Sequence, residues 1–67
     1  MTLGEALPKE MARVRDEVLP AYLEAGAAGV FGATFMRSAL DQAAKALAEG
    51  NVVEMLAVYE ELKGFDT

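Results

Sequence analysis

The stretch Ala48-Glu-Gly-Asn-Val-Val-Glu54 separates two helical patterns and decides the fold. Gly50 is the residue type that most often follows the last turn of a helix, because glycine adopts the left-handed conformation without steric cost. Asn51 is a preferred N-cap residue, and Glu54, three positions later, completes the pattern of a capping box. The sequence therefore predicts that one helix ends before Gly50 and that another begins directly after Asn51.

Apolar residues on both sides of this stretch recur at steps of three and four, the spacing that lines one face of an α-helix. Downstream, the pattern predicts a helix over 52–63, with Gly64-Phe65 as a Schellman stop in which Phe65 folds back onto the last turn. Upstream, it predicts a helix over 29–49. Along the other side of that helix, four residues of alternating sign at steps of four favour a solvent-exposed row of ion pairs: Arg37, Asp41, Lys45 and Glu49.

A third apolar stripe predicts a helix over about 8–25, but two prolines complicate it. Thr2 and Glu5 fit a capping box, which would leave Pro8 inside the helix with its ring against a carbonyl of the preceding turn. The alternative places Pro8 at the first helical position, with the residues before it as a separate turn or arm, and we favour it because a missing N–H costs nothing there. Pro20 removes a further helical hydrogen bond, so we expect a kink or a break near it.

Together these patterns predict one all-α domain over 1–67, a small bundle of three amphipathic helices with the first kinked or split near Pro20. The 67 residues are 54% hydrophobic and 25% charged, a composition typical of a globular chain. A chain of this length buries only about 60% of its unfolded surface. Because there is no cysteine to form a disulfide, we expect packing between two copies, as a homodimer, to supply the missing burial.

Charge and hydropathy exclude two classes of partner. The net charge of −5 has the wrong sign for binding nucleic acid, whose phosphates are neutralised by basic residues. The longest uncharged stretch runs from Ala25 to Met36, twelve residues, whereas a membrane-spanning helix needs about 20. No basic region followed by an apolar run opens the sequence, so we expect no secretory signal and a cytoplasmic location.

The side chains available for chemistry are few. The sequence has no histidine and no cysteine, and therefore lacks the usual general base and the best nucleophile at neutral pH. Carboxylates that are adjacent in sequence, such as Asp16 and Glu17, diverge by about 100° around a helix and do not converge on one substrate. We expect no enzymatic activity, no metal site and no cofactor.

The segment Ala25–Met36 departs from ordinary amphipathic helices because it is rich in glycine and alanine. Small residues four apart would let another helix approach closely. One interpretation is a buried elbow between the first two helices, with Phe31 and Phe35 filling the core of the monomer. The other is a surface between molecules. The candidate residues for this interface or pocket are Ala25, Gly29, Val30, Phe31, Gly32, Ala33, Phe35, Met36 and Tyr59.

Three classes of function fit these observations. The first is a non-enzymatic protein–protein interaction module, a homodimer that could also bind another protein. The second is a binder of small apolar ligands, because phenylalanine and methionine suit an adaptable apolar cavity between helices. Its pocket would be lined by Phe31, Phe35, Met36, Met55 and Tyr59.

The third class is an acidic inhibitor or decoy that binds a basic site on another protein. Net charge and size motivate it, because the C-terminal third of the chain carries most of the excess negative charge. The candidate acidic surface consists of Glu54, Glu60, Glu61 and Asp66.

Overall fold

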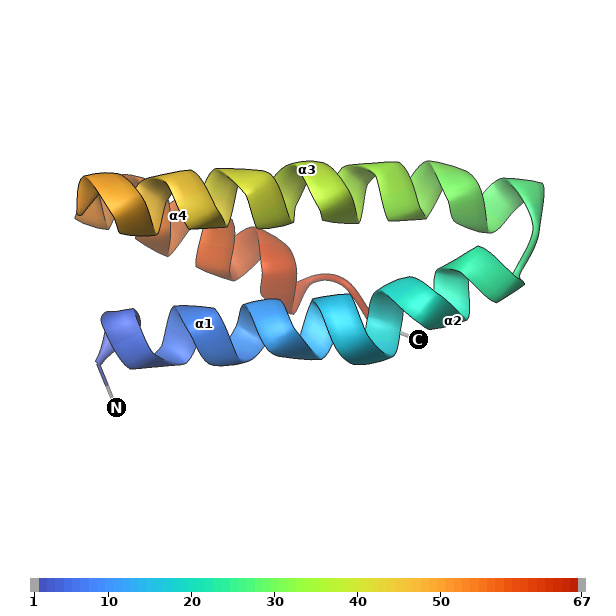
Figure 1. Cartoon of the computed structure of the whole chain (residues 1–67), viewed down its shortest axis with the longest axis horizontal. Coiled ribbons are helices and arrows are strands. Elements are labelled where there is room, and N and C mark those ends of the chain that lie inside the picture. The colour runs from blue at the N-terminus through green and yellow to red at the C-terminus, as the bar shows by residue number, and fades with distance from the viewer. Residues whose placement is uncertain (1, 67) are drawn as a thin grey trace.

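Three helical rods make up the protein, which Figure 1 shows as a computed structural model that describes residues 2–66. The first rod is bent and runs antiparallel to a long straight helix, and the last helix folds back against both of them (Figure 1). The predicted all-α bundle of three helices is therefore confirmed, and residues 2–66 contain no strand. The elements are α1 (Leu3–Arg13), a π-helical segment η1 (Val14–Val18), α2 (Leu19–Glu24), α3 (Ala27–Glu49) and α4 (Val52–Lys63).

The start of the first helix differs from our prediction. Helix α1 begins at Leu3, with Thr2 as its N-cap residue, and Pro8 lies inside it. The favoured arrangement, with Pro8 at the first helical position, is therefore wrong. Packing explains the difference, because Leu7 is fully buried and the helical turn before Pro8 is needed to carry it into the core. Pro8 itself is exposed, so the helical hydrogen bond that it cannot donate is lost at the surface, where water is available.

The kink or break predicted near Pro20 is present as a bend. The N–H of Leu19 donates to the carbonyl of Val14, five residues back, which makes the turn before Pro20 wider than an α-helical turn. Proline has no N–H with which to continue the normal ladder, and a π-helical turn is one of the recognised ways in which a helix bends. Residues 3–24 therefore form one continuous but bent rod.

The junction between α3 and α4 follows the prediction closely. Gly50 has φ 66° in the left-handed region, and its N–H donates to the carbonyl of Leu47. The N–H of Asn51 donates to the carbonyl of Ala46, which completes a Schellman motif. The side chain of Asn51 accepts from the N–H of Glu54 at 3.2 Å, as expected of an N-cap residue. Both predicted boundaries, at residues 49 and 52, are therefore observed.

The end of α4 does not have the predicted Schellman motif. Gly64 has φ −74°, a right-handed conformation, and its N–H donates to the carbonyl of Glu61, three residues back. A Schellman motif would have supplied N–H donors to the last carbonyls of the helix. Arg13 supplies donors instead, because its guanidinium donates to the carbonyls of Leu62 at 3.1 Å and Phe65 at 2.8 Å. Phe65 does fold back, as predicted, and its half-buried ring packs against the core.

The core lies between the three rods and is built mostly from α3 alanines and larger residues of the other helices. Small side chains on α3 allow its neighbours to approach closely, and the larger ones fill the space that remains. No helix within residues 2–66 is both long enough and apolar enough to cross a membrane. The buried apolar residues are Leu7, Val14, Val18, Ala33, Met36, Ala39, Ala43, Ala46, Met55, Val58 and Leu62.

Candidate interaction surface on α3

Two glycines of the candidate segment, Gly29 and Gly32, lie on the inner side of α3, against α2. Gly29 is buried, and a Cβ atom added to it would lie 1.7 Å from the carbonyl oxygen of Tyr22. The predicted close approach of another backbone is therefore real, but the approaching helix belongs to the same chain. The elbow interpretation is correct for this part of the segment.

Gly32 makes a similar contact with a side chain instead of a backbone. A Cβ atom at Gly32 would lie 2.5 Å from Cδ2 of the Tyr22 ring, which covers this half-buried glycine. Ala33 and Met36 continue the inner face and are buried. Gly29 and Gly32 therefore belong to the contact between α2 and α3, and Ala33 and Met36 are covered within the monomer.

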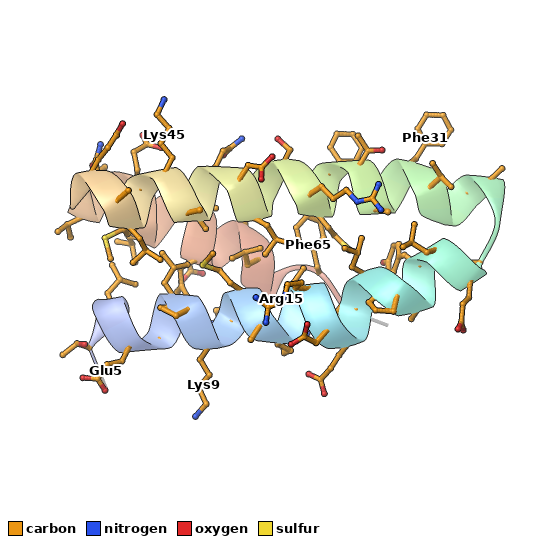
Figure 2. All side chains as sticks on the ribbon, in the orientation of Figure 1. Glu5, Lys9, Arg15, Phe31, Lys45 and Phe65 are labelled. Carbon is orange, nitrogen blue, oxygen red and sulfur yellow. The ribbon has the colours of Figure 1, made fainter. Side chains whose placement is uncertain are left out.

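The two phenylalanines lie on the outside, and their predicted place in the monomer core is wrong. Phe31 is 75% exposed and Phe35 is 64% exposed. Figure 2 shows Phe31 pointing away from the other helices. The reason is helical geometry: Gly29 and Met36 set the inner face, and Phe31 lies about 160° around the helix from Gly29 at 3.6 residues per turn. Since Phe31 and Phe35 are four residues apart, their rings are neighbours on one side of α3.

The other candidate residues differ in how far they are exposed and do not form one surface. Val30 is half exposed on α3, and Ala25 is exposed between α2 and α3. Tyr59 is half-buried on α4, with the Lys63 ammonium 5.4 Å from the centre of its ring. Met36 is fully buried in the core.

The predicted apolar pocket is not assembled. Met36 and Met55 lie in the core, whereas Phe31 and Phe35 face outward, so these side chains do not line one cavity. An open hollow of about 360 Å³ exists instead beside the elbow. Within it, the Tyr22 hydroxyl donates to the main-chain carbonyl of Asp66 at 3.0 Å. Its lining residues are Ala21, Tyr22, Ala25, Ala28, Gly29 and Asp66.

The candidate acidic residues are all exposed, but they do not share one direction. Glu54 and Glu61 are seven residues apart and lie on the same side of α4, whereas Glu60 is turned by about 100° from Glu61. Asp66 lies beyond the helix, where its main-chain carbonyl accepts from Tyr22. No group of three or more potential metal ligands occurs within the part of the chain that the structure describes.

The alternating row on α3 is exposed, as predicted, but its members do not pair with one another. The ion pairs found within residues 2–66 involve other residues, namely Glu10 with Arg13 and Arg15 with Asp16. The predicted row of ion pairs within the helix is therefore wrong, although its exposed position is correct. Its members are Arg37, Asp41, Lys45 and Glu49.

The exposed ion pair on η1, Arg15 with Asp16, changes the pKa values of both residues. The hydrogen bond from the Arg15 guanidinium lowers the pKa of Asp16 below its ordinary value, and the same hydrogen bond raises the pKa of Arg15. Water screens such a pair, so it contributes little to folding.

Two features could not be seen from the sequence: the contact of Arg13 with the end of α4, and the exposure of apolar residues near the start of α4. The sequence pattern did not identify the role of Arg13, whose side chain binds the end of α4. No local pattern encodes this contact, because its partners Leu62 and Phe65 lie 49 and 52 positions further along the chain. The apolar pattern of the helix over 52–63 also includes Val52 and Leu56, yet both are more than half exposed. Val53 beside them is 77% exposed.

Comparison with protein-family models, curated proteins and solved structures finds no match to this chain. The physical properties of the surface therefore carry the functional argument.

Proposed function

We propose that this chain is a non-enzymatic protein–protein interaction module that binds a second copy of itself through the outer face of α3. The observation that carries the proposal is the pair of neighbouring aromatic side chains, Phe31 and Phe35, which the fold leaves exposed while small residues fill the inner face. Aromatic rings are enriched at the centres of protein interfaces, and a contiguous apolar patch is typical of a surface that binds a partner.

The energetics of burying the two rings are compatible with a second copy of this chain as the partner. Aromatic side chains bury on the order of 150 Å² each, so covering both rings on both copies removes roughly 500 Å² from water. At about 25 cal/mol per Å², this burial is worth on the order of 10 kcal/mol, which is similar to the cost of association. The aromatic pair can thus nucleate a dimer, and other contacts along α3 must set its strength and geometry.

Two further properties agree with this role. The sequence has no histidine and no cysteine, which suits a binding module better than an enzyme that works by acid–base or nucleophilic chemistry. A chain without cysteine is also compatible with a reducing compartment, and we place the module in the cytoplasm.

Sedimentation equilibrium of the purified protein at tens of micromolar tests the proposal. We expect a dimer for the natural sequence and a monomer for Phe31→Ser combined with Phe35→Ser. Circular dichroism should show unchanged helix content in that variant, because both rings are exposed. Leu23→Ser, which removes an exposed apolar side chain from α2, is the matched control and should remain dimeric. A natural sequence that sediments as a monomer would overturn the proposal.

A further inference from the structure

The charges on the outer face of α3 are ordered in a way that specifies how two copies would meet. Four residues follow one another at steps of four with the signs plus, minus, plus and minus. All four are exposed, and none of them belongs to an ion pair within residues 2–66. Read from the other end, the same row runs minus, plus, minus, plus. The row is therefore complementary to a second copy of itself that runs in the opposite direction. Its members are Arg37, Asp41, Lys45 and Glu49.

We propose that two copies of the chain pair through α3 in antiparallel orientation, with the two-fold axis midway between Asp41 and Lys45. This inference rests on the proposed self-association and adds its geometry. Each Arg37 then lies opposite Glu49 of the second copy, and each Asp41 lies opposite Lys45 of the second copy. A parallel pair in register would place like charges opposite one another, which is unfavourable.

Helix packing is compatible with this arrangement. Side chains four residues apart form ridges on a helix surface, and the commonest packing of two helices interdigitates such ridges from both partners. The row from Arg37 to Glu49 is one of these ridges. When two copies of this charged row interdigitate, every charge lies beside an opposite charge only if the two helices run antiparallel.

The same register brings the exposed phenylalanines level with the start of α4 in the second copy. At 1.5 Å per residue, Phe35 lies about 12 Å from the two-fold axis, and Glu49 of the second copy lies about 9 Å from it on the same side. Phe35, and Phe31 one turn further, therefore extend past the end of the second copy's α3. They reach the level at which its α4 begins, where Val52 and Val53 are 64% and 77% exposed. Phe35 is turned by about 160° around α3 from Arg37, so the phenylalanines flank the charged row and are not part of it.

A charge exchange between residues 37 and 49 tests the register. Arg37→Glu should weaken the dimer about tenfold, because it places like charges opposite one another at two symmetric positions. Adding Glu49→Arg should restore the natural dissociation constant. The two residues are twelve positions apart, about 18 Å along one helix, so they cannot pair within a single copy. Restoration therefore reports a contact between copies.

A second variant separates specific pairing from net charge. Arg37→Glu combined with Glu17→Arg has the same net charge as the exchanged pair, but Glu17 is exposed on η1, away from the row. We expect sedimentation equilibrium to show no recovery for this control. Circular dichroism of each variant checks that the helices are intact.

The outcomes distinguish the inference from the proposed function. If the natural sequence is a monomer, the proposed self-association is overturned, and this inference with it. If the natural sequence is a dimer but Arg37→Glu has no effect, or if Glu49→Arg restores no more than Glu17→Arg does, the antiparallel register is overturned while self-association stands. Full recovery with Glu49→Arg alone supports the register.

Discussion

At its C-terminal end α3 turns into α4 through Gly50 and Asn51, whereas at its N-terminal end it lies so close to α2 that Gly29 has no room for a methyl group. The first junction satisfies its hydrogen bonds with neighbours in sequence. The second depends on a contact with Tyr22, which is brought to Gly29 only by the turn at Gly26.

The difference between the junctions shows where a glycine is needed for its conformation and where it is needed for space. Gly50 has a left-handed backbone, and a Cβ atom there would meet nothing within 4 Å. Gly29 is helical, and its Cβ atom would collide with a backbone carbonyl. Local conformation is adjusted at a modest cost, but two backbones in contact move only if the helices separate. Substitution of Gly29 should therefore cost more than substitution of Gly50.

The largest effect should come from Gly29→Ala. The new methyl group would lie 1.7 Å from the Tyr22 carbonyl oxygen, so α2 has to move away from α3. We expect a loss of about 3 kcal/mol or more in the free energy of unfolding, which exceeds the gain of about 1 kcal/mol in helix propensity. Urea denaturation followed by circular dichroism measures this loss.

Gly4→Ala is the control for that substitution. Gly4 is also helical, but the nearest atom to a Cβ atom there is 3.9 Å away, on Thr2. The propensity gain should then appear alone, as a stabilisation of about 0.5 kcal/mol. Equal effects at Gly4 and Gly29 would contradict the close approach of α2 and α3.

A smaller effect is expected from Gly32→Ala, since the contact there is with a side chain. The methyl group would lie 2.5 Å from the Tyr22 ring, which can rotate at a cost of about 2 kcal/mol. In a Tyr22→Leu background the ring is gone, and the cost of Gly32→Ala should fall by about 1 kcal/mol or more. A double-mutant cycle in urea measures this coupling, and additive effects would show that the ring does not cover Gly32.

Gly50→Ala should cost less than Gly32→Ala, about 1.5 kcal/mol, because only the left-handed conformation at φ 66° opposes it. Gly50→Asn should be milder than Gly50→Ala, as asparagine adopts this conformation more readily than alanine does. Thermal unfolding of the two variants tests this order. A loss at Gly50 as large as that at Gly29 would break the distinction between the two junctions.

The same distinction explains which parts of the fold could be predicted from the sequence. The boundaries at residues 49 and 52 follow from caps that are complete within a few residues, and the bend follows from the missing N–H of Pro20. The start of α1 could not be predicted in this way, because burial of Leu7 outweighs the hydrogen bond lost at Pro8. The end of α4 could not be predicted either, since Arg13 reaches it from a distant part of the chain.

The candidate surface shows the same limit. The spacing of small residues correctly indicated a close helix contact, and the contact with Tyr22 identifies α2 as the neighbour. Phe31 and Phe35 share the apolar periodicity of the helix, yet the face that α2 and α4 cover lies elsewhere. Periodicity identifies a stripe, and only the three-dimensional arrangement shows whether another helix covers it. The exposed pair is thus a result of the fold and became the basis of the functional proposal.

The smallest loss of stability should come from substituting Asn51, whose side chain caps α4 by accepting from the N–H of Glu54 at 3.2 Å. Asn51→Ala leaves that N–H to water and should cost about 1 kcal/mol, because the position is exposed and water replaces part of the hydrogen bond. Asn51→Ser keeps an acceptor oxygen and should cost only about a few tenths of a kcal/mol. Urea denaturation of both variants measures the difference. A cost for Asn51→Ser as large as that for Asn51→Ala would show that the side-chain cap is not what ends the turn, and that the α3–α4 junction, like the α2–α3 junction, depends on packing.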